Sequence, residues 1–186
     1  IGTDNYKAGQ EMGRRLAELT GGRANVAVLS GQPGYDNLEE RYRGLTEISE
    51  TYPEIRFLTL VYDNYDSPTA LSRLSQISAQ YPQVDTLVCI EGTGGQAIGN
   101  NYTKEARKFS HILAFDNMEE TIRGLKNGTI DGVEAQEPYQ MGLMAVRAIA
   151  ENEAENTLTT RSVFTSIRWL TAENVDEQEQ AYEDET

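Results

Sequence analysis

The sequence predicts an α/β protein with a doubly wound, mainly parallel sheet. Short apolar runs of the buried-strand type alternate with amphipathic stretches of helical length, at a repeat of roughly 30 residues. Each apolar run ends abruptly on polar or glycine-rich residues, as a parallel strand does before its crossover helix. Because strand–helix–strand units connect with right-handed crossovers, their repetition places helices on both faces of one sheet.

The first half of the chain is expected to alternate helix, strand, helix, strand and helix. Asp36 or Asn37 is the expected N-cap of the second helix, and Ser67 the expected cap of the third, with Pro68 in its first turn. The expected ranges follow from apolar spacing and from glycine breakers, and they are Tyr6–Leu19, Asn25–Ser30, Asp36–Tyr52, Arg56–Tyr62 and Ser67–Ala79.

The second half continues the alternation and then changes character. Its expected strands and helices are Val84–Ile90, Gln96–Lys108, His111–Phe115, Met118–Leu125, Gly132–Ala135 and Pro138–Glu151. One long extended segment, Ser162–Leu170, follows a polar linker. The tail, Ala172–Thr186, has seven Asp or Glu residues and no Lys or Arg, so we expect most of it to be frayed.

Composition excludes several classes of function. A chain of 186 residues with 38% hydrophobic residues can bury the core of one domain or one large lobe. The formal net charge of −14 argues against nucleic acid or an anionic membrane as the main partner. Cys89 lies inside an apolar strand and is expected to be a small buried hydrophobic residue. His111 has no second His or Cys nearby, so we expect no metal site.

Polar side chains follow several of the predicted strands. Asp116 and Gln136 lie at strand ends, Tyr65 follows another strand, and Arg41 comes from a nearby helix. Because ligands of parallel α/β sheets bind beyond the strand carboxyl ends, we expect these side chains to bind a small polar molecule such as a sugar. Each residue also has a structural interpretation: Asp116 as a helix cap, Arg41 in a surface ion pair, Gln136 as a loop residue.

Other kinds of site fit the sequence less well. Gly92-Thr93-Gly94-Gly95 could bind a phosphate at a helix N-terminus, but it lacks the lysine of a P-loop, and Glu91 would repel an anion. The single histidine leaves no Ser-His-Asp set. Glu91 and Asp116 could in principle form an acid pair for glycoside hydrolysis, although paired acids also occur in binding sites. We therefore expect no enzyme and no cofactor.

At these residues the chain resembles the type I periplasmic sugar-binding proteins, the ribose- and galactose-binding family of ABC importers. The resemblance implies a periplasmic-binding-protein-like I fold with a Rossmann-like lobe. It covers nearly the whole chain up to about Asn174, but only the C-terminal part of the family's length. The matching motifs are TDNYKAGQEMG (Thr3–Gly13), SGQPGYDNLEERYRGL (Ser30–Leu45), LAFDN (Leu113–Asn117) and VEAQEPYQMGLMAV (Val133–Val146).

The resemblance implies roles for individual residues. Arg41, Asp116 and the hinge glutamine Gln136 would hold sugar hydroxyls, and Tyr65 would stack on the ring. Glu91 stands where the ribose-binding type commonly has an asparagine ligand, which leaves the identity of the sugar open. We include it among the expected ligand-binding residues, with a more basic or amino-substituted ligand as one possibility.

The resemblance also implies a division of the chain. Residues 1–136 would form the second, C-terminal lobe of a two-lobed receptor, and residues 137–161 a helix returning toward a first lobe that would precede Ile1. Residues 162–175 would be an extended segment crossing the hinge, and residues 176–186 a disordered acidic tail. The apolar face of the returning helix, residues 138–151, would be covered by the first lobe or by a dimer partner.

The expected function is therefore to bind a small sugar or sugar-like solute in a cleft between lobes and to deliver it to the membrane subunits of an ABC importer. The expected location is extracytoplasmic, in the periplasm or tethered to a Gram-positive cell surface. Alternatives are the effector-binding region of a LacI-type transcription regulator, the sugar-sensing ectodomain of a two-component kinase and, least favoured, an enzyme on a flavodoxin-like sheet.

Overall fold

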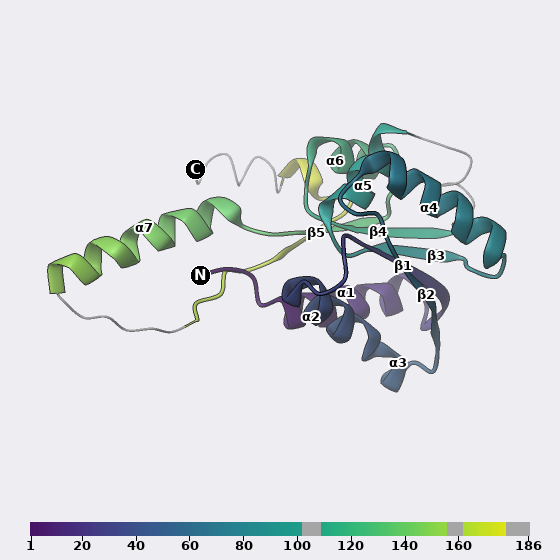
Figure 1. The fold of residues 1–186 in the computed structure, drawn as a ribbon, viewed down its shortest axis with the longest axis horizontal. Helices are drawn as coiled ribbons and strands as arrows, with labels where there is room; N and C mark the ends of the chain where they lie inside the picture. Colours follow the sequence, from purple (N-terminus) through teal and green to yellow (C-terminus); the bar gives the residue numbers. More distant parts are fainter. Residues whose placement is uncertain (102–108, 156–161, 178–186) are drawn as a thin grey trace.

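A computed structural model describes residues 1–101, 109–155 and 162–177 of the chain. One six-stranded sheet forms its centre, and helices cover both faces (Figure 1). In spatial order the strands are β2 (Glu54–Tyr62), β1 (Arg23–Ser30), β3 (Thr86–Cys89), β4 (His111–Phe115), β5 (Gly132–Ala135) and β6 (Arg168–Leu170). The first five strands are parallel, and β6 pairs with β5 in the antiparallel direction. The predicted fold class is confirmed.

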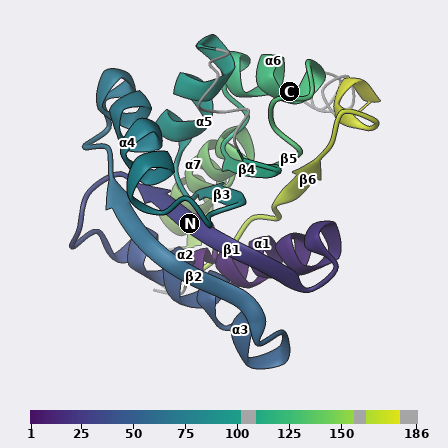
Figure 2. The same cartoon turned by 90° about the vertical axis from the view of Figure 1, so that its right-hand side faces the viewer.

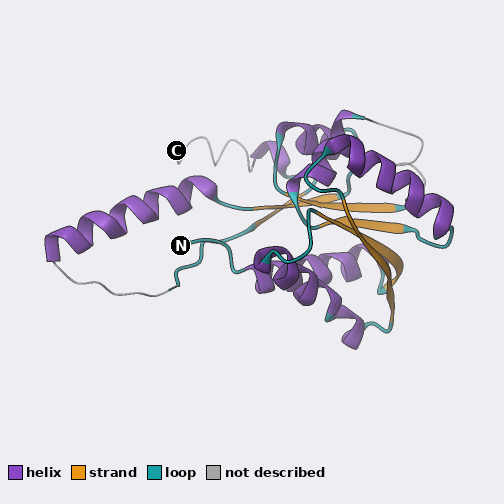
Figure 3. Ribbon diagram, in the orientation of Figure 1, coloured by secondary structure: helices purple, strands orange, loops and turns teal. Residues whose placement is uncertain are grey.

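The helices divide into two layers, as Figure 3 shows by its helix and strand colours. One layer contains α1 (Asn5–Thr20), α2 (Asp36–Thr46) and α3 (Ile48–Thr51). The other contains α4 (Ser67–Gln80), α5 (Gly92–Asn100) and α6 (Glu119–Lys126). The view along the other axis shows both layers on either side of the twisted sheet, with β6 at the edge farthest from β2 (Figure 2).

Each face of the sheet has its own hydrophobic core, which explains the continuous apolar strands. In β1, Val26 and Val28 pack with the α1 layer, whereas Ala27 and Leu29 pack with the α4 layer. Strands covered on both faces are hydrophobic at every position instead of alternating. Cys89 is fully buried in the second of these cores, as the sequence predicted.

Helices α1 and α2 pack with their backbones in close contact, and two glycines make this possible. A Cβ atom on Gly9 would lie 2.1 Å from the carbonyl oxygen of Arg41, and one on Gly44 would lie 2.2 Å from that of Tyr6. No real side chain tolerates such distances. The close contact brings the start of α1 against the part of α2 that contains Arg41.

Several local predictions were wrong. Neither Asp36 nor Asn37 caps α2, whose N-cap is Tyr35 without a side-chain hydrogen bond. The expected long helix breaks at Glu47, which accepts hydrogen bonds from Tyr6 and Gln10 of α1. Asp66 caps α4 in place of the expected Ser67, and its carboxylate accepts from the Thr69 backbone N–H at 2.9 Å.

Further differences concern the bounds of one helix, one exposed side chain and the C-terminal tail. Helix α5 begins at Gly92, four residues before the expected start, and ends at Asn100 with Asn101 as its C-cap; residues 102–108 of the expected helix lie outside the described residues. Leu19 was expected on the buried stripe of α1 but is 38% exposed. In the tail, Val175 is fully buried, and residues 178–186 lie outside the described part of the chain.

Three segments leave the sheet at the same end, beyond the carboxyl ends of the parallel strands. The N-terminal segment and residues 162–167 run side by side, joined by a bridge between Gly2 and Phe164. Helix α7 (Pro138–Glu155) follows β5 and extends away from both layers (Figure 1). None of its residues from 138 to 151 is buried, and Val146 and Ile149 are 66% and 62% exposed.

Candidate ligand-binding site

Gln136, directly after β5, connects three other polar side chains at the strand ends. Its Oε1 accepts a hydrogen bond from the Thr3 hydroxyl at 2.6 Å and one from an Arg41 Nη2 at 3.3 Å. Its Nε2 donates to Oδ1 of Asp116 at 2.6 Å. Three of the five residues predicted for the site therefore belong to one hydrogen-bond network, which Thr3 links to the N-terminal segment.

Arg41 reaches this network from α2 and is only 5% exposed. Its guanidinium donates to the Asn5 side chain at 2.9 Å and to the Ile90 carbonyl at 3.0 Å. Its central carbon also lies over the ring of Phe115, 3.8 Å from the ring centre. These contacts fix the orientation of the planar donor group, and the alternative interpretation as a surface ion pair is wrong.

The charge of Arg41 is buried among carboxylates. Burial lowers the pKa of its guanidinium, and the nearby Asp116, Glu134 and Glu91 oppose that shift. Arginine stays protonated in proteins, so the site contains a permanent cation. A guanidinium has five N–H groups, and the hydrogen bonds to Asn5, Ile90 and Gln136 use three, which leaves two free of these partners.

Asp116 has a left-handed backbone conformation, with φ of 66°, directly after β4. Its N–H donates to the Glu134 carbonyl at 2.9 Å, which holds the turn. The carboxylate lies against Gly92, where an added Cβ would be 3.2 Å from Oδ2. Burial raises the pKa of Asp116, while Gln136 and Arg41 lower it. Helix α6 is capped at Met118, so Asp116 is not a helix cap.

Tyr65 presents an exposed aromatic face beside this network. It follows Asn64 in a turn where both residues have positive φ, and its N–H donates to the Asp63 carboxylate at 2.9 Å. The ring covers Gly31, where an added Cβ would lie 2.2 Å from a ring carbon. Tyr35 contacts the ring edge-on, with centroids 5.8 Å apart. The ring is thus fixed in position while 45% of the residue is exposed.

Glu91 is used differently from the other four predicted residues. It is the N-cap of α5, where its two carboxylate oxygens accept from the backbone N–H groups of Thr93 and Gly94, each at 2.9 Å. Those N–H groups are the ones a phosphate would need, so the capped helix disfavours phosphate binding here. A direct contact between Glu91 and a ligand stays a prediction.

Asp63 is a buried acid that the sequence analysis missed. Burial raises its pKa from 3.8 to about 8, and the negative charge of Glu91, whose carboxyl interacts with it, adds to the shift. The residue is fully buried, one carboxyl oxygen accepts from Tyr65, and the other has no donor among the described residues. A protonated Asp63 can donate a hydrogen bond to Glu91, which stabilises the loop that carries Tyr65.

We expect the stability of the protein to fall as pH rises through the titration of Asp63. A carboxyl with a higher pKa in the folded than in the unfolded chain stabilises the folded state below the unfolded pKa, and that contribution disappears as pH passes the folded value. Between about pH 4 and pH 8, wild type should lose unfolding free energy relative to Asp63→Asn, measured by urea denaturation. The exposed Asp36→Asn is the control and should follow wild type; parallel curves for Asp63→Asn would contradict the assignment.

Four residues of the site were not identified from the sequence. Thr3 precedes α1, Asn5 is the first residue of α1, Phe115 directly precedes Asp116, and Asp63 directly follows β2; only Phe115 and Asp63 lie within two residues of a predicted site residue. A cavity of about 550 Å³ lies beside the site, between α2 and the ends of β1 and β2, and its lining does not include Gln136. The residues predicted for the ligand site instead lie at the carboxyl ends of the parallel strands.

The fold and the polar side chains gathered at the strand ends are those of a ligand-binding α/β protein. Comparison with known proteins identifies its family. Residues 1–156 match the family model described as periplasmic binding protein domain. The chain therefore belongs to the periplasmic binding protein family. In the part of the chain that the structure describes, no helix combines the length and apolar character needed to cross a lipid bilayer.

Several characterised relatives are named for sugars or polyols. A xylitol-binding protein of Mycolicibacterium smegmatis is 24% identical over 158 residues, which cover 83% of this chain and 45% of the relative. A xylose/arabinose-binding protein of Sulfolobus acidocaldarius is also 24% identical, with 94% of this chain and 44% of the relative covered. The chain thus spans less than half the length of these relatives.

Solved structures give the same result at the level of the fold. A solute-binding protein of an ABC transporter from Burkholderia graminis, in complex with D-arabinose, superposes with a TM-score of 0.86 at 27% identity. A glucose-galactose binding protein from Geobacillus stearothermophilus has a TM-score of 0.86 at 28% identity. In both cases the alignment covers 94% of this chain and 62% of the other.

Proposed function

We propose that this chain binds a small sugar or sugar-like solute at the edge formed by the strand ends. The observation that carries the proposal is the network in which Gln136 holds the Arg41 guanidinium and the Asp116 carboxylate in fixed positions. Membership of the periplasmic binding protein family supports it, as do relatives named for xylitol, xylose, arabinose, glucose and galactose.

The chemistry of the site suits a polyol. Two N–H groups of Arg41 remain to donate to hydroxyls, and Asp116 can accept from neighbouring hydroxyls. The exposed ring of Tyr65 provides an apolar surface for the C–H face of a sugar. Glu91 is the fifth proposed contact, and one of its acceptor positions would have to be shared between ligand and helix cap.

The direct test is isothermal titration of the chain with pentoses, hexoses and pentitols. We expect saturable binding of one such class without chemical turnover of the ligand, as befits a binding protein that is not an enzyme. Asp116→Ala should weaken that binding about 10-fold to 100-fold, because a charge-assisted hydrogen bond contributes about 1.5–3 kcal/mol. Asp176→Ala, which removes an exposed ion pair with Lys126, should leave it unchanged. No saturable sugar binding would overturn the proposal.

We further propose that residues 1–136 form the second lobe of a two-lobed receptor and that residues 137–161 and 162–175 connect it to a first lobe. The departure of three segments from the sheet at the carboxyl ends of the parallel strands supports this division. Closure of the two lobes around the solute would then be the change that importer membrane subunits recognise. This role implies an extracytoplasmic location, in the periplasm or at the cell surface.

The apolar face of α7 requires a partner in this scheme, either the first lobe or a second copy of the chain. Exposed Val146 and Ile149 support that requirement. If the 186-residue chain uses a second copy, sedimentation velocity should show a dimer that forms with increasing concentration and is lost in Val146→Glu/Ile149→Glu. A monomer at every concentration would exclude the dimer and leave the first lobe as the proposed partner.

A further inference from the structure

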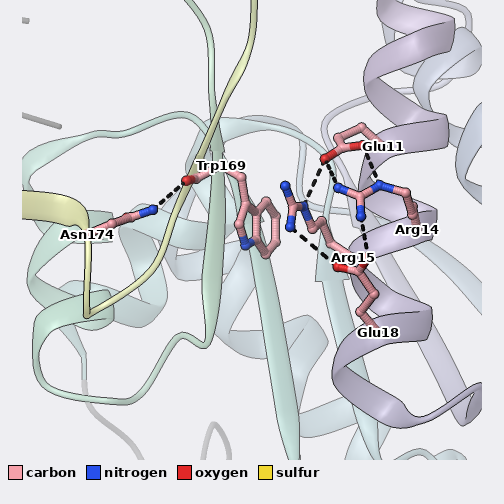
Figure 4. Close-up of polar contacts among 6 residues, drawn as sticks. All are labelled: Glu11, Arg14, Arg15, Glu18, Trp169 and Asn174. Atoms are coloured by element: carbon pink, nitrogen blue, oxygen red, sulfur yellow. Dashed lines mark hydrogen bonds and ion pairs between the residues drawn. The ribbon is translucent and has the colours of Figure 1, made fainter.

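A second cavity, of about 440 Å³, lies between α1 and residues 164–169, on the α1 face of the sheet. It is separate from the Gln136 network, since neither Gln136 nor Asp116 lines it. Its aromatic side chains are Trp169 and the 53%-exposed Phe164. Figure 4 shows Arg15 reaching from α1 toward the Trp169 ring, where its guanidinium carbon lies 5.4 Å from the ring centre.

Most charged groups in the lining of this cavity already have a partner of opposite sign. Lys7 pairs with Asp4 at 3.1 Å. Arg15 pairs with Glu11 at 2.8 Å and with Glu18 at 3.3 Å, so its positive charge is shared between two acids (Figure 4). Arg168 pairs with Glu137, outside the lining. These pairs leave one acidic side chain of the lining without a partner.

That side chain is Glu134, in the middle of β5. Its register opposite Phe115 on β4 and Trp169 on β6 directs it to the α1 face of the sheet, where both of those side chains pack. The residue is fully buried, and neither carboxyl oxygen has a hydrogen-bond partner among the described residues. Burial raises the pKa of Glu134, and the charge of Glu11 adds to that effect, while Arg41 and Arg15 oppose it.

A buried carboxyl without a donor is costly, so the chemistry of the cavity indicates what would complete it. An anion would be repelled. A Ca²⁺ ion needs six to eight oxygen ligands, and the described residues contain no cluster of three acidic, histidine or cysteine side chains able to hold a metal. An ammonium group is compact and carries three donors, and its alkyl chain would fit beside Trp169, Phe164 and Ile167. The net charge of −14 favours a cation in general.

We propose that this cavity binds a small organic ammonium compound, whose cationic head donates hydrogen bonds to Glu134. The ligand would lie in contact with Phe164 and Asp4, next to the Gly2–Phe164 bridge of the hinge segments. The site does not depend on sugar binding at the strand ends.

Trp169 is the only tryptophan of the chain and lines the cavity, so its fluorescence reports on occupancy. The 186-residue chain is titrated with n-butylammonium chloride and, separately, with butan-1-ol, potassium chloride and calcium chloride. We expect a saturable change for the ammonium alone. A response to the alcohol at the same concentrations would show a merely apolar cavity, and an equal response to the inorganic salts would show general ion binding; either result overturns the proposal.

The variant Glu134→Gln keeps the shape of the side chain and removes its ability to ionise. It should fold at least as stably as wild type, because a buried carboxyl without partners is removed, and circular dichroism with thermal melting checks this. Its affinity for n-butylammonium should fall about 10-fold or more. Glu18→Gln is the matched control, since Glu18 also pairs with Arg15 but does not line the cavity, and it should bind as wild type. Unchanged affinity in Glu134→Gln, or no saturable change in wild type, would overturn the proposal.

Discussion

Replacement of Arg41 by methionine is expected to abolish measurable binding of the proposed sugar. Methionine is close in length and apolar, so it can still cover the Phe115 ring from which the guanidinium carbon lies 3.8 Å away. The variant loses the two donors available to ligand hydroxyls as well as the hydrogen bond that orients Gln136. Because each charge-assisted hydrogen bond contributes about 1.5–3 kcal/mol, the combined loss corresponds to at least ~100-fold in affinity.

The control for Arg41→Met is Arg43→Met on the same helix. Arg43 lies over the ring of Tyr6, 4.6 Å from its centre, and makes none of the contacts with Asn5, Ile90 or Gln136. We expect its affinity, measured by isothermal titration, to match wild type. Urea denaturation of both variants separates loss of binding from loss of folding. If folded Arg41→Met bound the sugar within about threefold of wild type, Arg41 could not be a principal contact.

The second large effect is expected at Gly9, where alanine should destabilise the fold and displace α2. Its Cβ would lie 2.1 Å from the Arg41 carbonyl oxygen and 2.9 Å from the Leu45 nitrogen, both backbone atoms that cannot rotate away. The helices must separate, which we expect to lower the free energy of unfolding by about 1–3 kcal/mol. Since Arg41 moves with α2, sugar affinity should fall in the same variant.

Gly142→Ala provides a matched control for this prediction. Gly142 lies in helix α7, and nothing is within 4 Å of the position its Cβ would take. Alanine there should be neutral or should stabilise by about 0.5–1 kcal/mol through helix propensity. Urea denaturation of the two variants compares the same substitution with and without a close backbone contact. Equal effects would mean that the α1–α2 contact is looser than the structure shows.

The fold class was predictable because it depends on features that are local in sequence. Apolar runs such as His111–Phe115 and Gly132–Ala135 are strands in the structure with the predicted bounds. Helix caps were less predictable: Asp36 is the first residue of α2 and Asp66 directly precedes α4, but only Asp66 places its carboxylate within reach of a backbone N–H. That choice depends on loop geometry, which neighbouring residues do not determine alone.

The candidate site was predictable in part for a similar reason. Asp116 and Gln136 were found because the carboxyl ends of parallel strands all lie at one end of the sheet. Thr3, the partner of Gln136, lies 133 residues from it in sequence, and Asn5, the partner of Arg41, lies 36 residues from it. No periodicity relates such distant positions. Glu134 was overlooked because a charged residue inside an apolar strand gives no local indication of whether a partner will reach it.

The bridge between the N-terminal segment and residues 162–167 has a thermodynamic consequence. It consists of two backbone hydrogen bonds, from Gly2 to the Val163 carbonyl at 3.1 Å and from Thr165 to the Gly2 carbonyl at 3.0 Å. At about 1 kcal/mol each, they contribute far less than the roughly 5–15 kcal/mol that stabilise a whole domain. The adjoining α1 and β6 are held by the core, so these segments can separate by local opening while the sheet stays intact. The amide protons of these two segments should therefore exchange with solvent long before those of β1 and β3.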